Sequence, residues 1–135
     1  MTLDLERLRD LAGIRYAIRQ FLSASEAIAK GAGVTPLQHQ ALLAVKTWRQ
    51  ASMAVKDLAD QLLLTHHAAV QLVNRLEAAG LAVRTRSNQD RRSVWVTLTP
   101  AGEALLDKLA ALHLAEMLRQ EPLLSKSLRH LRRLK

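Results

Sequence analysis

The sequence predicts a single domain, residues 1–135, that is mainly α-helical and carries one small β-hairpin. Apolar residues recur every three or four positions over most of the chain, which is the spacing of an amphipathic helix. Between residues 81 and 98 the spacing changes to every second position, as in a β-strand. Thr-Pro pairs at 35–36 and 99–100 are helix start signals. These observations place a hairpin between helical segments.

The N-terminal helix is predicted to continue to about residue 30. Its apolar positions recur at helical spacing and are Leu8, Leu11, Ile14, Ile18, Phe21 and Leu22. Gly31 and Gly33 then make continuation costly. A second helix is predicted from Pro36 to about Trp48, because Thr35 can cap it and Gln38 can reach back to complete a capping box.

Two shorter helices follow, joined by a tight turn. A brief extended Met-Ala-Val segment leads into the first, from about Val55 to Leu63, which lacks a capping side chain because Ala54 precedes it. Thr65 caps the second, which is predicted from His66 to Ala79. Gly80 ends it, since glycine readily adopts the left-handed conformation found at helix C-termini. Together these elements form a helix-turn-helix.

A hairpin is predicted next, with its tip at Ser87 to Arg92. The residues expected on its apolar face alternate along both strands and are Leu81, Val83, Thr85, Val94, Val96 and Leu98. The residues expected on the opposite face are Ala82, Arg84, Arg86 and Trp95. On that face Trp95 can stack on a guanidinium group and stiffen the strands.

Two further helices are predicted at the C-terminal end. Thr99 and Pro100 begin the first, and Pro122 is expected to end it, because an internal proline removes a backbone hydrogen bond. The apolar positions of the last helix are Leu124, Leu128, Leu131 and Leu134. The terminal helices, about residues 3–30 and 100–135, carry more leucine than one small domain can cover. This surplus predicts dimerisation through these helices.

A helix-turn-helix followed by a basic hairpin is the element order of a winged helix-turn-helix, here about residues 35–100. At about 100° per residue, the second helix turns four apolar side chains toward the core: Ala69, Leu72, Val73 and Leu76. His67, Gln71 and Asn74 then point outward. Amide and imidazole groups can bond base edges in the DNA major groove, and small apolar groups can contact a thymine methyl. The alternative is an ordinary polar surface helix.

The composition favours an acidic partner. The chain contains 20 Lys+Arg against 12 Asp+Glu, a formal charge of +8, so nucleic acid and an anionic membrane surface are the two candidates. It contains no cysteine, which excludes disulfides, thiolate nucleophiles and thiolate metal sites. The charged N-terminus and the lack of a long apolar run indicate neither a secretory signal nor a spanning helix, so a cytoplasmic location is expected.

No sequence pattern indicates an enzyme. The Gly-rich phosphate loop and the common nucleophile and zinc motifs are absent. His66 and His67 are neighbours that diverge by about 100° on a helix, so they cannot share a metal ion without distortion of the helix. His39 and His113 are candidates to line a small-molecule or metal pocket, with ordinary packing as the favoured interpretation. We therefore expect no catalytic residues, no metal site and no cofactor.

A set of residues at fixed spacing runs from Leu58 to the end of the hairpin. It comprises Leu58-Ala59, Arg75-Leu76-Glu77, Gly80-Leu81, Arg84, Asp90, Arg92, Leu98-Thr99 and Gly102. In type and spacing this set resembles the DNA-binding core of MarR-type transcriptional regulators. The likeness is weaker over residues 36–48 and extends to both ends only as helix order. His66 and His67 differ from the small polar residues more usual at this place in the family.

The resemblance implies a homodimer with interlocked N- and C-terminal helices, bound to a palindromic operator in double-stranded DNA and expected to act as a repressor. The implied major-groove helix would contact DNA through Thr65, His66, His67, Ala68, Val70, Gln71, Asn74 and Arg75. The hairpin, as the wing, would contact it through Arg84, Arg86, Arg91 and Arg92. Arg92 is expected in the minor groove, with Asp90 orienting a neighbouring guanidinium. Relief by a small-molecule effector is also expected, at a site that the sequence does not identify.

The alternative to DNA binding is that the basic C-terminal tail contacts a protein or a membrane surface. The tail from Lys126 to Lys135 is basic and amphipathic, which also fits a protein-interaction helix or a membrane-surface helix. Its leucines recur every three or four residues and fit a dimer seam equally well. Deleting the tail discriminates between the two, since lost dimerisation indicates the seam and lost liposome binding indicates the membrane.

Overall fold

The computed structural model of the protein describes residues 2–86 and 93–133. The chain divides into two compact units, residues 29–109 and residues 1–28 together with 110–135. The first unit contains the predicted winged-helix lobe, and the second consists of the predicted terminal helices. The grouping of all 135 residues into a single domain stays a prediction.

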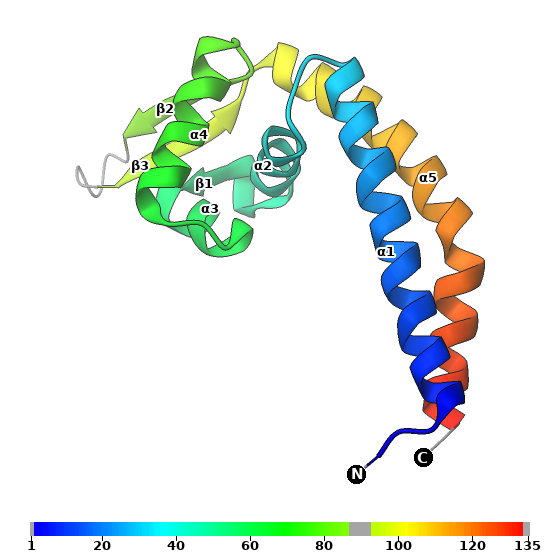
Figure 1. The fold of residues 1–135 in the computed structure, drawn as a ribbon. Helices are drawn as coiled ribbons and strands as arrows, with labels where there is room; N and C mark the ends of the chain where they lie inside the picture. The colour runs from blue at the N-terminus through cyan, green and yellow to red at the C-terminus, as the bar shows by residue number, and fades with distance from the viewer. Residues whose placement is uncertain (1, 87–92, 134–135) are drawn as a thin grey trace. The chain divides into compact units, whose positions relative to one another are not determined.

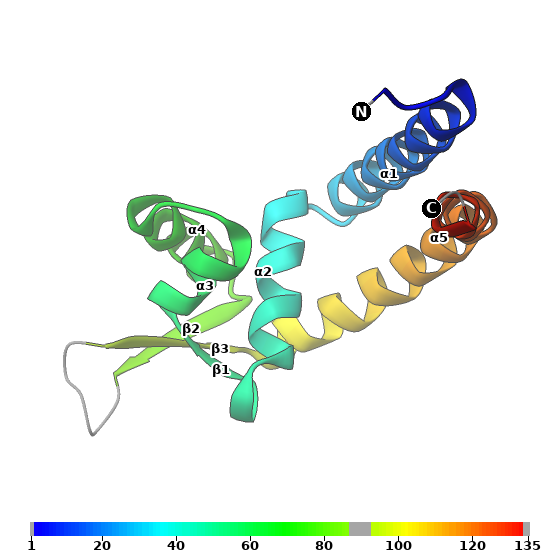
Figure 2. The same cartoon turned by 90° about the horizontal axis from the view of Figure 1, so that it is seen from below.

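Three helices of the 29–109 unit lie on one side of a small sheet, as Figures 1 and 2 show. They are α2 (Pro36–Thr47), α3 (Val55–Leu62) and α4 (His66–Ala78). A short 3₁₀ helix, η1 (Arg49–Ala51), leads from α2 toward the sheet. The order of these elements is the predicted helix-turn-helix, and the fold class is confirmed.

The sheet contains β1 (Ser52–Ala54), β2 (Ala82–Arg86) and β3 (Val94–Leu98). The strand order is β1-β3-β2, and both pairings are antiparallel. β1 is the predicted short extended segment before α3. Between the sheet and the helices lies a core whose fully buried side chains include Leu42, Val45, Met53, Leu58, Leu76 and Val96. This core fixes α4 and the hairpin in one unit.

The predicted caps at Thr35 and Thr65 and the predicted end of α4 at Gly80 are confirmed. Thr35 and Gln38 form a complete capping box at the start of α2. The Thr65 hydroxyl accepts a hydrogen bond from the Ala68 N–H at 3.1 Å and so caps α4. Gly80 follows α4 with φ +73°, the left-handed conformation that favours glycine.

The Thr-Pro-x-Gly motif ties the start of α5 (Pro100–Arg133) to the turn after α4. The Thr99 hydroxyl donates to the Gly80 carbonyl oxygen at 2.6 Å and accepts from the Gly102 N–H at 3.1 Å. The Thr99 N–H donates to the Leu81 carbonyl oxygen at 3.1 Å. A Cβ atom on Gly102 would lie 2.0 Å from that same oxygen, so only glycine fits. The motif therefore anchors the base of the hairpin.

A surface ion pair braces the same region from α2. Lys46 Nζ donates to Glu103 Oε1 at 2.9 Å. This hydrogen bond raises the pKa of Lys46 above its ordinary value. Because both side chains are about half exposed, solvent screening keeps the contribution of the pair to stability small.

The alternation along β2 differs from the predicted one by one residue. Ala82 is 1% exposed, whereas Val83, expected on the apolar face, is 43% exposed. The reason is that Leu81 still belongs to the turn, where its N–H donates to the Leu76 carbonyl oxygen at 2.9 Å. The strand begins at Ala82, whose small side chain fits beneath the helices.

This shift separates residues that we expected on one face. Arg84 pairs with Val96, which is fully buried on the helix side, and Thr85 pairs with Trp95. Because paired residues of an antiparallel sheet share a face, Arg84 and Trp95 lie on opposite faces. The prediction that Arg84, Arg86 and Trp95 share a face, with Trp95 stacked on a guanidinium there, is therefore wrong. A carboxylate on α4, described below, holds Arg84 on the helix side.

In the second unit, α1 (Leu5–Gly31) runs antiparallel to the later part of α5 (Figure 1). The Asp10 carboxylate contacts His130 near one end. A Cβ on Gly13 would lie 3.2 Å from Ser127 Oγ. At the other end Ser25 Oγ lies 2.6 Å from His113 Nε2.

Pro122 does not end the helix, so the predicted break and the separate last helix are wrong. α5 continues from Pro100 to Arg133 with Pro122 inside it. An internal proline costs a helix about 3 kcal/mol. Here α1 holds α5 on both sides of the proline, through His113 before it and Ser127 after it. A break in α5 at Pro122 would remove the contacts with α1 on one side of the proline.

Candidate nucleic-acid interface

Helix α4 has one face in the core, as predicted. Ala69, Leu72, Val73 and Leu76 are at most 4% exposed. Their burial fixes the rotation of the helix about its axis, because these positions recur at a spacing of three and four residues. The residues between them are therefore held on the outside.

The predicted DNA-contacting residues of α4 lie along this outer face. His66, His67, Gln71, Asn74 and Arg75 are exposed, and Ala68 and Val70 are partly buried beside them. Thr65 is exposed at the cap. We call His67, Gln71 and Asn74 the α4 stripe, since they follow one another at successive turns.

The first two residues of the α4 stripe hydrogen-bond to each other. Gln71 Nε2 lies 3.1 Å from His67 Nε2. An amide nitrogen donates, so the imidazole Nε2 accepts in this bond. The bond leaves Gln71 Oε1 without a partner in the described part of the chain, as an outward-facing acceptor.

Arg84 links the hairpin to α4. Its guanidinium donates to Glu77 Oε1 through Nη1 and to Asn74 Oδ1 through Nη2, and Nη2 also lies 3.3 Å from the Val70 carbonyl oxygen. The Arg84 backbone N–H donates to Glu77 Oε2 at 3.2 Å. The two charged side chains are about one third exposed, so solvent screens the pair less than a fully exposed one.

Glu77 is the site residue that sequence reasoning missed. The sequence contains Glu77 and Arg84 at the spacing of the Arg-Leu-Glu, Gly-Leu, Arg pattern, but their pairing was not predicted. The signal was available: a carboxylate in the last turn of a helix faces a strand that returns after a three-residue turn. In the structure the Arg84 guanidinium bonds Glu77 and Asn74 of α4, and its expected contact with DNA stays a prediction.

Arg86 is exposed at the end of β2. The remaining predicted wing residues, Asp90, Arg91 and Arg92, lie outside the described residues. The part of the wing that the structure describes therefore supplies one exposed arginine, Arg86, and one arginine bonded to α4, Arg84.

The two histidines considered as pocket residues are both buried. His39 is 6% exposed and His113 is 8% exposed. His113 bonds Ser25 and packs against Phe21 with an interplanar angle of 68°. Over residues 2–86 and 93–133, no group of three His, Cys, Asp or Glu side chains is placed to hold a metal ion. In the same ranges no helix has the length and apolar character needed to cross a membrane.

Comparison with known proteins agrees with the winged-helix geometry. The sequence model of the MarR family matches residues 32–93. The organic hydroperoxide resistance transcriptional regulator of Bacillus subtilis is 36% identical over 75 residues, which are 56% of this chain and 50% of that protein. The chain spans about half the length of the curated relatives it matches first. The five curated relatives are all named as transcriptional regulators or repressors, in agreement with the expectation that the chain is not an enzyme.

Solved structures share the fold. AbsC, a MarR family transcriptional regulator from Streptomyces coelicolor, superposes with a TM-score of 0.77 at 22% identity, covering 89% of this chain and 81% of that one. A mutant of MarR from E. coli, complexed with operator DNA, superposes with a TM-score of 0.65 at 21% identity, covering 82% and 79%. Residues 32–93 are therefore similar in sequence to the MarR family, and the chain shares the fold of these solved structures.

Proposed function

We propose that the protein is a cytoplasmic regulator of transcription that binds a specific sequence in double-stranded DNA as a homodimer. In this proposal α4 lies in the major groove and the hairpin lies along the adjacent minor groove. The observation that carries it is the α4 stripe, an outward row of amide and imidazole groups on a helix whose other face is buried. The shared fold of the E. coli MarR mutant complexed with operator DNA supports it.

The hydrogen bonds within the interface indicate how the α4 stripe reads bases. Arg84 occupies Asn74 Oδ1, so Asn74 presents its amide hydrogens to the groove. Donors of this kind fit the N7 and O6 acceptors of guanine or the O4 of thymine. Gln71 donates to His67 and presents Oε1, an acceptor that fits the amino group of adenine or cytosine. The two amides thus prefer different bases, and in this arrangement neither is free for a bidentate contact with adenine.

Basic residues around the α4 stripe supply the affinity that does not depend on sequence. Arg75 and Arg86 are exposed on α4 and on the hairpin, where they suit phosphate contacts. Arg91 and Arg92, outside the described residues, are proposed to extend these contacts into the minor groove. Each released counterion makes binding more dependent on salt, so affinity should fall steeply as the salt concentration rises.

Two apolar stripes on the terminal helices support the homodimer. On α1, Leu8, Leu11, Ile18 and Leu22 fall within an arc of about 80° at 100° per residue. On α5, Leu114, Met117, Leu118 and Leu128 fall within an arc of about 100° by the same count. These eight side chains are between 40% and 62% exposed. Exposed stripes of this kind mark interfaces, and a two-fold partner would cover both while presenting two copies of α4 to one palindrome.

The membrane alternative finds less support in the second unit. Ser127 is 3% exposed, and the neighbouring His130 contacts the Asp10 carboxylate of α1. The last turns of α5 therefore use one face to pack on α1, as expected of a structural seam. Deleting residues 126–135 should abolish dimerisation in sedimentation experiments, and an intact dimer that loses binding to anionic liposomes would favour the membrane.

Selection of bound sequences from random duplex DNA tests the proposed function. A homodimer with two copies of α4 should enrich a palindrome whose half-sites are about one helical turn apart. Enrichment of no motif, or of a single asymmetric site, would contradict the proposal. Repression, and its relief by a small-molecule effector, are further parts of it, tested with a reporter placed behind the enriched palindrome.

A further inference from the structure

A cavity lies behind the wing, on the side of the sheet away from α4. It has a volume of about 660 Å³ and is lined by Trp48, Arg49, Gln50, Ser52, Asp57, Thr85 and Trp95. We call it the rear-wing pocket. Its place follows from the strand register, because Thr85 and Trp95 pair on the face opposite Arg84 and Val96. It shares no residue with the α4 stripe.

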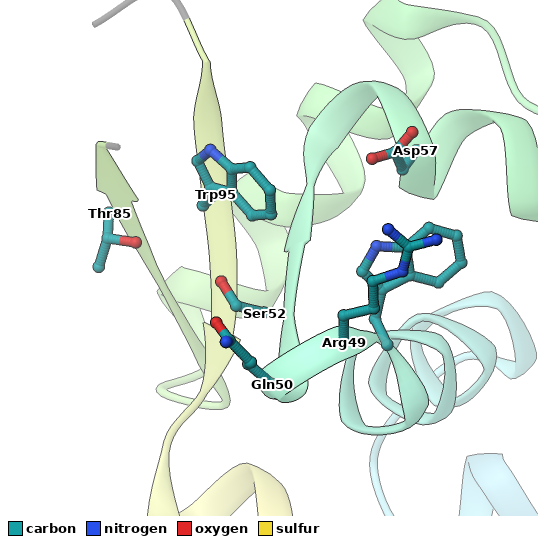
Figure 3. A pocket seen from close by; sticks show the side chains of 7 residues that line it. Arg49, Gln50, Ser52, Asp57, Thr85 and Trp95 are labelled. Atoms are coloured by element: carbon teal, nitrogen blue, oxygen red, sulfur yellow. The ribbon is translucent and has the colours of Figure 1, made fainter. Parts of the chain in front are cut away.

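The rear-wing pocket presents two opposite charges that have no ion-pair partner among the residues that the structure describes. Arg49 and Asp57 form no ion pair with any residue in the ranges 2–86 and 93–133. Figure 3 shows both on the side of the pocket opposite Trp95. Arg49 is exposed and Asp57 is partly buried. A few charged groups in a concave site fix the orientation of a ligand, so this cation and carboxylate on one wall suit a ligand that carries both charges.

The apolar part of the pocket is aromatic. The chain has 2 tryptophans, and both line this cavity. An indole face attracts a flat ring by stacking. The indole Nε1 of Trp95 is buried and has no hydrogen-bond partner in the part of the chain that the structure describes, which is uncommon for tryptophan.

The backbone at the pocket rim is strained. Gln50 and Ala51 have φ values of 57° and 52°, in the left-handed region that side chains other than glycine rarely adopt. Two such residues in succession are costly, and strain of this kind gathers at binding sites. Here it carries the chain from Trp48 and Arg49 directly into β1, which begins at Ser52.

We propose that the rear-wing pocket binds a small aromatic zwitterion of the α-amino acid type. The carboxylate bonds Arg49, the ammonium group bonds Asp57, and the ring stacks on Trp95 across the pocket. This arrangement matches both charges on one side and an indole on the other (Figure 3). A ligand so placed would connect η1 and α3 to the paired wing residues Thr85 and Trp95. Its effect on DNA affinity rests on the proposed function, whereas binding itself does not.

Intrinsic fluorescence measures this binding directly, because every tryptophan of the chain lines the pocket. The intact protein is titrated, without DNA, with L-phenylalanine, and calorimetry repeats the titration with L-phenylalanine and L-tyrosine. We expect saturable binding with a shift in tryptophan emission. 2-Phenylethylamine and 3-phenylpropionate each lack one charge and should bind at least about tenfold more weakly. No binding of either amino acid, or equal binding of a singly charged analogue, overturns the proposal.

Two variants and a matched control locate the site. Arg49→Met and Asp57→Asn should each weaken the binding of L-phenylalanine by about tenfold or more, since each removes one charge-assisted bond. Asp60→Asn, on the same helix one turn later and exposed, should bind like the parent. Circular dichroism checks that each variant is folded. Parent-like binding by folded Arg49→Met or Asp57→Asn overturns the assignment, as does an equal loss in Asp60→Asn.

Discussion

Substitution of Gly102 by alanine tests the junction that anchors the wing. The added Cβ would lie 2.0 Å from the Leu81 carbonyl oxygen, and ordinary contact begins at 3.4 Å, so the two must separate by about 1.4 Å. Overpacking against backbone costs about 1–3 kcal/mol. The movement also disturbs the hydrogen bond from the Thr99 N–H to Leu81, worth about 1 kcal/mol net. Alanine favours a helix over glycine by up to about 1 kcal/mol.

The balance predicts that Gly102→Ala lowers the free energy of unfolding by about 2 kcal/mol. Urea unfolding followed by circular dichroism measures it, and the midpoint of thermal unfolding should fall by roughly 3–5 °C per kcal/mol. Gly31→Ala is the control, because its Cβ would meet nothing within 4 Å. It should be neutral or slightly stabilising. Parent-like stability of Gly102→Ala, or an equal loss in both variants, would refute the reasoning.

Three further substitutions test the elements that hold α4. Leu63→Gly should raise the free energy of unfolding by about 0.5–1 kcal/mol, since Leu63 has φ 55° and is 92% exposed; a destabilised variant in urea would contradict this. Thr65→Ala should lower the free energy of unfolding by about 1 kcal/mol, because it removes the hydrogen bond that the Ala68 N–H donates to the Thr65 hydroxyl. Thr65→Ser should recover most of this stability in the same assay. Glu77→Gln should lower the free energy of unfolding by about 1 kcal/mol. It should also speed amide hydrogen exchange at the Arg84 N–H, which donates a hydrogen bond to Glu77. Unchanged exchange at this N–H would argue against the link between Glu77 and Arg84.

Local signals predicted the helix starts well. A threonine followed by proline, or by a run with helical spacing, satisfies backbone donors within one turn, so Thr35 and Thr65 act as caps whatever the rest of the chain does. The rotation of α4 was likewise predictable, because burying one apolar row fixes where His67 and Gln71 point. These features depend on neighbours in sequence.

The two mistaken predictions depended on distant neighbours. Pro122 would end an isolated helix, but the predicted break took no account of α1 packing on both sides of it. The predicted face of β2 rests on an alternation that begins at Leu81, whereas the strand begins at Ala82. Glu77 makes the helix side favourable for Arg84 by pairing with its charge.

The rear-wing pocket was beyond sequence reasoning for a similar reason. Its lining comes from four separate segments, and the contribution of η1 depends on positive φ values at Gln50 and Ala51. Neither residue is one that signals a left-handed turn. The sequence analysis singles out Trp95, but no sequence pattern indicates that Trp48 and Asp57 line the same cavity.

The most direct test of the central claim, that the α4 stripe reads bases, is the affinity of the protein for every single-base variant of its selected half-site. Gln71→Ala should lose discrimination at one base pair, by about 1–3 kcal/mol, and keep it elsewhere. Arg86→Ala should weaken binding to all variants by a similar factor, as a phosphate contact does. If Gln71→Ala keeps the parent's base preferences at every position, or weakens all sites evenly, then α4 does not read the operator as described.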